Sequence, residues 1–100
     1  MKATPNTFII GAPKCGSTTL WALLRQHPDV FLTEEKEPNH FNKDLQLLHG
    51  QMPYQDAKRY ASLFDGVRDE RRIGEASVWY QASEVAAREI AAVSPDAKII

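Results

Sequence analysis

The sequence predicts an α/β fold in which a parallel sheet is flanked by helices. Short apolar runs at residues 8–10, 30–32, 73–78 and 97–100 have the length and composition of strands or buried extended segments. The stretches between them place apolar residues at helical spacing. Strands that alternate with helices along one chain favour a parallel sheet with helices packed on its faces.

The first run contains a β-branched pair and is bounded by a Pro-Asn pair and by Gly11, which is typical of a short buried strand. Residues 11–16 begin and end with glycine, and they predict a turn whose backbone approaches a ligand closely. A helix is predicted to follow, with Ser17 as its N-cap and an apolar face formed by Leu20, Leu23 and Leu24.

The middle of the chain is predicted to hold a turn, a strand, a polar loop and a helix. Pro28 favours a turn before the run at residues 30–32, and a polar loop follows at residues 33–41. Residues 42–51 fit a helical turn or an irregular insert equally well. The next helix is expected to begin at Pro53 and to end at Gly66, with its apolar stripe at Tyr54, Ala57, Tyr60, Ala61 and Phe64.

After the run at residues 73–78, a last helix is predicted with Ser83 as its cap and Pro95 just beyond its end. Its inner face is expected to consist of Val85, Ala86, Ile90 and Val93. A final strand is predicted to begin at Ala97. Because that strand has no following turn, we expect residues 1–100 to be the N-terminal part of a single domain that continues beyond the chain.

Composition limits the partners and the location. A formal net charge of −1 gives no reason to expect nucleic acid or an acidic membrane surface as a partner. The lone Cys15 excludes an internal disulfide, and no apolar run approaches the length of a transmembrane helix. We therefore expect a cytoplasmic protein without nucleic-acid or membrane partners, whose oligomeric state the sequence leaves open.

The predicted strand, glycine-bounded loop and helix together form a site for an anion. Free backbone N–H groups and the positive end of the helix dipole point at one spot there. Lys14 adds a full positive charge, and the hydroxyls of Ser17, Thr18 and Thr19 add donors. The Walker pattern of NTPases would place its lysine where Ser17 stands, so a metal–triphosphate site is less expected. The segment is interpreted as a phosphate cradle without a metal.

The order Pro-Lys-x-Gly-Ser-Thr at residues 13–18 resembles the 5′-phosphosulfate loop of sulfotransferases that use 3′-phosphoadenosine 5′-phosphosulfate (PAPS). The resemblance implies the N-terminal part of the P-loop-like sulfotransferase fold and PAPS as co-substrate. It implies transfer of a sulfuryl group to a hydroxyl or amine acceptor that is carbohydrate-like or a small molecule. PAPS would be bound by Lys14, Cys15, Gly16, Ser17, Thr18 and Thr19, with Lys14 also catalytic.

The segment at residues 36–41 resembles one in heparan-sulfate-type and bacterial carbohydrate sulfotransferases, where a glutamate precedes a short aromatic-ended stretch. The resemblance implies that Glu37 is the general base for the acceptor, with Pro38 and Phe41 holding the loop. A solvated charged loop is the alternative. His40 is a competing base, because the cytosolic branch of the family uses a histidine, but beside Phe41 a packed histidine is favoured.

Residues 74–80 resemble the family segment Glu-Lys-Ser-x-x-Tyr/Phe, whose lysine faces the substrate. Ala76 stands at that lysine position, so the charge comes from Lys36 or from beyond the chain, or the substrate differs from sulfated glycans. Trp79 and Tyr80 either line an acceptor cleft or pack in the core.

The family's 3′-phosphate site uses an arginine and a serine just after the strand that begins near Lys98. That arginine and serine would come after Ile100, so the hundred residues alone are expected to be inactive. A P-loop kinase or nucleotide hydrolase is the alternative enzyme, but it needs a magnesium-binding aspartate at a strand end, and none of the three preceding strand-like stretches ends in one. A non-catalytic nucleotide-binding module stays open because of Ala76.

Overall fold

The computed structural model describes residues 4–11, 16–35, 37–45 and 56–100, and these contain a four-stranded parallel sheet. The strand order is β2-β3-β1-β4, which confirms the predicted α/β class. The strands are β1 (Thr7–Ile9), β2 (Val30–Leu32), β3 (Arg72–Ala76) and β4 (Lys98–Ile99).

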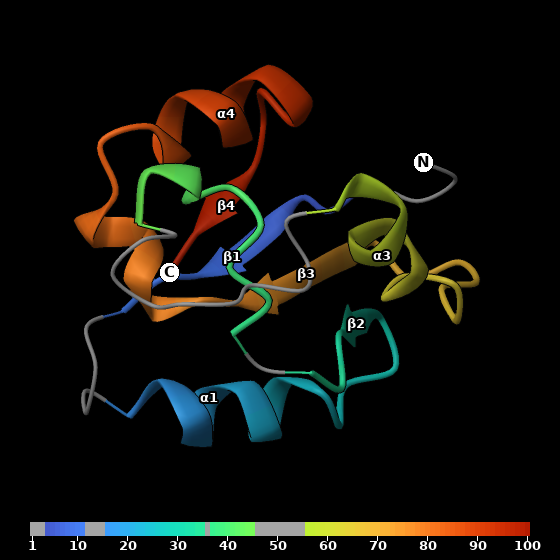
Figure 1. Cartoon of the computed structure of the whole chain (residues 1–100). Helices are drawn as coiled ribbons and strands as arrows, with labels where there is room; N and C mark the ends of the chain where they lie inside the picture. The colour runs from blue at the N-terminus through green and yellow to red at the C-terminus, as the bar shows by residue number, and fades with distance from the viewer. Residues whose placement is uncertain (1–3, 12–15, 36, 46–55) are drawn as a thin grey trace.

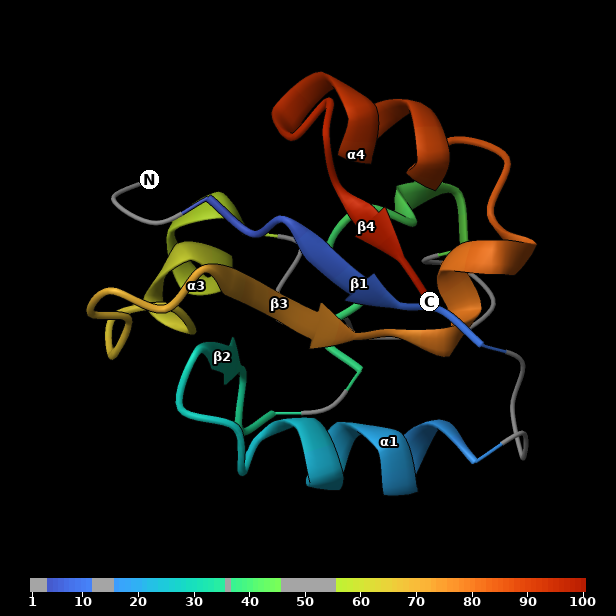
Figure 2. The same ribbon diagram turned by 180° about the vertical axis from the view of Figure 1, so that it is seen from behind.

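Helices cover both faces of this sheet. α1 (Ser17–Leu24) lies on one face, whereas α3 (Ala57–Ser62) and α4 (Ala86–Val93) lie on the other, as Figures 1 and 2 show from opposite sides. Two short 3₁₀ helices, η1 (Lys43–Leu45) and η3 (Val78–Ala82), lie in the connections. The result is a three-layered arrangement with β1 and β3 at its centre.

The face under α1 has a small aliphatic core. Ile9, Leu32 and Ala76 are buried there, and Leu20, Trp21 and Leu24 of the helix pack against them. Residues with the spacing i, i+1 and i+4 share one helix face, so Trp21 occupies the inner position.

Two details of the predicted first helix are wrong. The side chain of Leu23 is 60% exposed, because Trp21 takes the inner position instead. The N-cap is Gly16, not Ser17, and no side chain caps this helix end. Gly16 has φ 83°, a left-handed conformation that glycine adopts without steric cost, so the chain enters the helix one residue earlier than predicted.

The opposite face has an aromatic core. Phe8 at the centre of the sheet meets the ring of Phe41 edge-on, with ring centroids 5.9 Å apart. Tyr60 and Phe64 also meet edge-on, at 5.4 Å. Such edge-to-face pairs add about 0.5–1.5 kcal/mol each beyond the burial of their area. The other buried members are Tyr80, Ala86 and Ile90.

The predicted bounds of α3 are wrong at both ends. Pro53 and Tyr54 lie outside the described residues, and the helix begins only after Asp56, whose extended backbone makes it the N-cap. The Asp56 carboxylate accepts the N–H groups of Lys58 and Arg59. The helix ends at Ser62, because tight i→i+3 turns carry the chain on to Gly66.

The segment after β3 was predicted to stay extended to residue 78, but it turns into η3 instead. The N-cap position of α4 is Val85 and not Ser83, although the Ser83 hydroxyl accepts the N–H groups of Val85 and Ala86. Val93 is 42% exposed and does not belong to the inner face of α4. Within the described residues, no helix is long and apolar enough to cross a membrane.

Gly74 allows β1 and β3 to pair. A Cβ built on Gly74 would lie 1.9 Å from the backbone oxygen of Thr7, its partner across the ladder. Neither backbone can give way without breaking the ladder, so only glycine fits here.

We predict that Gly74→Ala lowers the free energy of unfolding by about 3 kcal/mol, because the added methyl overlaps backbone in the centre of the sheet. Denaturant unfolding measures this loss. Gly11→Ala is the matched control, since a Cβ there meets nothing within 4 Å. Equal stability of the two variants would contradict the prediction.

Candidate active site

The carboxyl ends of β1 and β3 form the natural binding edge of this sheet. The two strands are neighbours, yet β1 leads to α1 on one face whereas β3 leads to α4 on the other. Adjacent strands whose connections leave on opposite faces open a crevice beyond their carboxyl ends, where α/β proteins bind ligands. Two of the three segments that resemble sulfotransferase motifs concern this edge. The segment at residues 13–18 follows β1, and Glu37 of the segment at residues 36–41 is hydrogen-bonded to the end of β3.

The first motif enters α1 through Gly16. The helix ladder starts with the N–H of Leu20 donating to the Gly16 carbonyl at 3.1 Å, so it does not use the amides of the first turn. Thr18 and Thr19 are exposed there, and the first turn contains no acidic residue. This helix end therefore suits an anion. Lys14 and Cys15 lie outside the described residues.

Glu37 is held at the end of β3. Its backbone N–H donates to the Ala76 carbonyl at 2.8 Å, and its carboxylate accepts the N–H of Val78 at 3.2 Å. The amide of Ser77, the residue directly after β3, donates to the Ile9 carbonyl at 3.1 Å. Glu37 thus lies beside the strand end from which the first motif departs.

The backbone around Glu37 is strained. Glu37 and Asn39 have φ values of 60° and 53°, in the left-handed region that costs a non-glycine residue about 1–2 kcal/mol. Pro38 between them is fully buried, and Phe41 packs in the aromatic core. The expectation that these two residues hold the loop is confirmed.

His40 is a packed residue, as favoured from the sequence. Its ring stacks on Tyr60 with centroids 4.1 Å apart and meets Phe41 edge-on at 4.8 Å. Only 9% of the residue is exposed.

Glu75 is a functional candidate that the sequence analysis missed. Its fully buried carboxylate accepts hydrogen bonds from the hydroxyls of Tyr60, Tyr80 and Ser77. Burial raises the pKa of Glu75 to about 7, although these three bonds act in the opposite direction. Burial also raises the pKa of both tyrosines, so the phenols remain donors. The available signal was a glutamate inside an otherwise apolar strand.

In the segment at residues 74–80, where the family's lysine is replaced by Ala76, the Ala76 side chain is fully buried in the aliphatic core under α1. Lys36, one possible source of the missing charge, lies outside the described residues. Tyr80 packs in the core and also forms part of the wall of a cavity beside α4, whereas Trp79 is 40% exposed.

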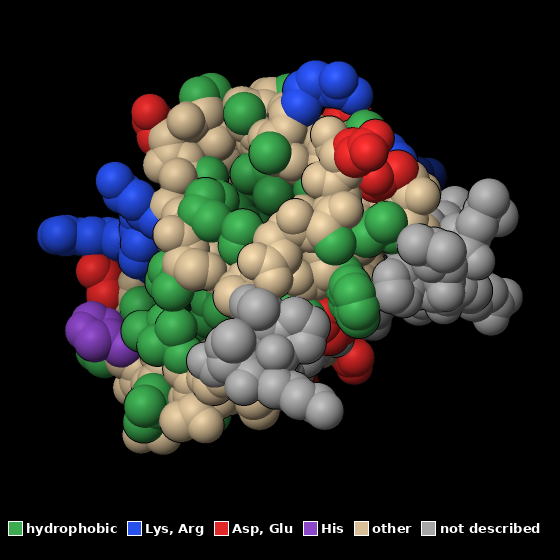
Figure 3. Space-filling model, turned by 90° about the vertical axis from the view of Figure 1, so that its left-hand side faces the viewer, with side chains coloured by type: hydrophobic (Ala, Val, Ile, Leu, Met, Phe, Trp, Pro, Cys, Tyr) green, Lys and Arg blue, Asp and Glu red, His purple; other side chains and the backbone are tan. Residues whose placement is uncertain are grey.

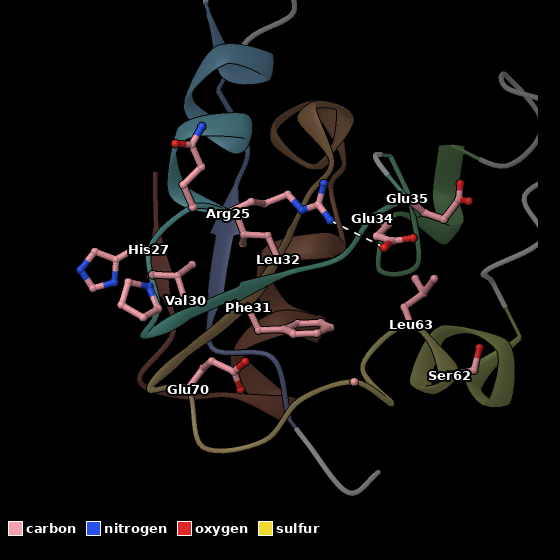
Figure 4. Close-up of a pocket in the computed structure, with 13 residues that line it drawn as sticks. Arg25, His27, Val30, Phe31, Leu32, Glu34, Glu35, Ser62, Leu63 and Glu70 are labelled. Atoms are coloured by element: carbon pink, nitrogen blue, oxygen red, sulfur yellow. Dashed lines mark ion pairs between the residues drawn. The ribbon is translucent and has the colours of Figure 1, made fainter.

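The described surface has two cavities. One of about 600 Å³ extends along β2 and is crossed by the ion pair between Arg25 and Glu34, 3.9 Å apart (Figure 4). The other, of about 410 Å³, lies between α4 and η3, and its lining includes Tyr80, Gln81, Ile10 and Ile99. Figure 3 shows hydrophobic side chains gathered on one face of the molecule. The described lining of the cavity along β2 includes no residue of the first motif and not Glu37.

Among the described side chains, no group of three or more His, Cys, Asp or Glu could hold a metal ion. The described part of the site thus consists of a helix start that suits an anion and a carboxylate at the neighbouring strand end. A model of the Sulfotransferase family matches residues 5–97, and the chain therefore belongs to the sulfotransferase family.

The chain is similar to a sulfotransferase of known structure from Alicyclobacillus acidocaldarius, with a TM-score of 0.83 and 39% identity over 97% of this chain and 43% of that one. It is 35% identical to human carbohydrate sulfotransferase 15 over 65% of its residues. It is also 35% identical, over 99% of its residues, to bifunctional heparan sulfate N-deacetylase/N-sulfotransferase 1 of Caenorhabditis briggsae.

The chain spans only 12% of the length of the human carbohydrate sulfotransferase and 11% of the length of the Caenorhabditis briggsae enzyme. The resemblance to sulfotransferases of the carbohydrate type is nevertheless confirmed. Family membership favours sulfuryl transfer over the kinase or nucleotide-hydrolase alternative.

We predict that Glu75 makes stability depend on pH. Its pKa is about 7 in the folded protein against 4.5 ordinarily, so between these values the folded state binds more protons than the unfolded state. Its contribution is therefore fully present below about pH 4.5 and is lost as the pH rises through 7. The free energy of unfolding of the wild type, minus that of Glu75→Gln, should fall by about 3 kcal/mol over this range.

Denaturant unfolding of both proteins at several pH values measures this difference, and the titration of all other groups cancels in it. A difference that stays constant from pH 4 to pH 8 would contradict the raised pKa.

Proposed function

We propose that the whole protein transfers a sulfuryl group from PAPS to a hydroxyl or amine of a carbohydrate-like or small-molecule acceptor. The observation that carries the proposal is the juxtaposition at one sheet edge. The first motif leaves the end of β1, and Glu37 is hydrogen-bonded to the end of the neighbouring β3. The sequence similarity to carbohydrate and heparan sulfate sulfotransferases supports the same acceptor class.

In this proposal, the amides of residues 15–18 and the charge of Lys14 hold the 5′-phosphosulfate. In-line transfer breaks the bond between sulfur and the phosphate oxygen and forms a bond between sulfur and the acceptor atom. Lys14 stabilises the negative charge that develops on the leaving oxygen, by analogy with phosphoryl transfer. Ser17, Thr18 and Thr19 add hydroxyl donors, and no metal is required.

Glu37 is proposed as the general base. As the acceptor attacks, its O–H or N–H proton passes to a carboxylate oxygen of Glu37. The Val78 N–H holds that carboxylate in one orientation, which limits the motion that would waste a catalytic group.

We further propose that the chain is the N-terminal part of one sulfotransferase domain, which supplies the 3′-phosphate site from later residues. The coverage of 43% of the Alicyclobacillus acidocaldarius structure supports this reading. The cytoplasmic location stays a prediction.

Lys14→Ala should abolish sulfuryl transfer by the whole protein, a loss of about 10³-fold or more, because the leaving oxygen loses its cation. The thermal unfolding midpoint should not change. Turnover with PAPS and an acceptor measures the loss. Lys58→Ala, at an exposed lysine of α3, is the matched control. Wild-type turnover by Lys14→Ala would overturn the cradle assignment.

Glu37→Gln should lower kcat by about 10²–10⁴-fold while PAPS binding changes little, because glutamine keeps the size of the side chain but takes no proton. Steady-state kinetics and calorimetric titration with PAPS separate the two quantities. Glu34→Gln, the same substitution on an exposed side chain of the same loop, is the control and should keep wild-type kcat.

His40→Ala distinguishes the competing base. If it loses turnover while Glu37→Gln keeps it in full, then His40 is the base and the carbohydrate-type mechanism is wrong.

A further inference from the structure

The segment that carries Glu37 is held by the side chains of Ser77, which lies between β3 and η3, and of Tyr80 in η3. The N–H of Asn39 donates to the Ser77 hydroxyl at 3.1 Å, and the N–H of His40 donates to the Tyr80 hydroxyl at 2.9 Å. These bonds lie two and three residues beyond Glu37. A left-handed backbone at non-glycine residues persists only where its surroundings leave it no alternative, and these two bonds supply that constraint.

A hydroxyl group needs a fixed direction to act as such an acceptor. It has one proton and two lone pairs, and it rotates to suit its neighbours. Here the Ser77 hydroxyl donates its proton to one oxygen of the Glu75 carboxylate, at 2.6 Å, and the Tyr80 hydroxyl donates to the other, at 2.9 Å. With both protons directed at Glu75, the lone pairs face the amides of Asn39 and His40.

We infer that Ser77 and Tyr80 are positioning residues for the Glu37 carboxylate, and that buried Glu75 fixes the direction of their hydroxyl protons. The inference rests on the proposed role of Glu37 as base. The chain of contacts runs from the Glu75 carboxylate through two hydroxyls to two backbone amides. It sets the strained turn that presents Glu37 at the end of β3.

Tyr60 provides an internal control. Its hydroxyl also donates to the Glu75 carboxylate, and its ring is as deeply buried as that of Tyr80. It contacts the loop through its ring, which stacks on His40, and among the described residues its hydroxyl bonds to Glu75 and not to the loop backbone. A phenylalanine at position 60 keeps that stacking. Removing either hydroxyl therefore costs Glu75 one donor, but only the loss at Tyr80 deprives a backbone amide of the loop of its acceptor.

The experiment compares Tyr80→Phe, Ser77→Ala and Tyr60→Phe in the whole protein. We expect Tyr80→Phe and Ser77→Ala to lower kcat by about 10–100-fold, because a small displacement of a catalytic group has an effect of this size. PAPS affinity, measured by calorimetric titration, should stay within about twofold in all three. Tyr60→Phe should keep kcat within about twofold, although both Tyr→Phe variants lower the unfolding midpoint.

Equal kcat in Tyr60→Phe and Tyr80→Phe, together with wild-type kcat in Ser77→Ala, would overturn the inference and leave the cluster a purely structural role. Ser77→Ala keeps the inference testable if Tyr80→Phe does not fold.

A second measurement separates this inference from the proposed function. On a Glu37→Gln background, adding Tyr80→Phe should lower kcat by less than about twofold, because no base remains to be positioned. An undiminished loss on that background would overturn the inference while the base assignment stands. Full turnover by Glu37→Gln alone would overturn the base assignment itself.

Discussion

The pairing of β1 with β3 is the constraint on which the rest of the structure depends. Gly74 lets the two backbones approach, and the amide of Ser77 extends the ladder by bonding the Ile9 carbonyl. One strand then releases the phosphosulfate motif, and the other anchors Glu37 and η3. The strand from which the first motif continues and the strand that anchors Glu37 therefore share one hydrogen-bonded ladder.

Beneath that ladder, Glu75 is a costly choice for a core position. An isolated buried carboxylate is strongly disfavoured, and a hydrophobic residue would satisfy the packing. The compensation comes from hydroxyls on α3, on η3 and at the end of β3, which tie these elements to one group. Because the carboxylate has two oxygens and no proton of its own when ionised, it orders several donors at once, which no apolar side chain could do.

Periodicity and turn residues were sufficient to predict the parallel sheet and its four strands. They could not rank neighbouring apolar residues, so Leu23 and Val93 were predicted to face inward although they are exposed. The glycine entry into α1 was missed because the serine beside Gly16 is a good cap in isolation. Glu75 was not identified because two of its hydrogen-bond donors, Tyr60 and Tyr80, come from other elements. The pattern of a strand reveals a polar residue but not the side chains that contact it.

The start of α1 has a consequence for how substrate and fold are coupled. Most helices complete their first turn with a side chain of their own, but α1 enters through Gly16 with no side-chain cap. In the proposed function, the phosphosulfate oxygens would accept from the same first-turn amides that a cap would satisfy. The donor would then take the place of a side-chain cap, and its binding would stabilise the first turn of α1. The rate of amide hydrogen exchange in the first turn of α1 would then report whether the donor is bound.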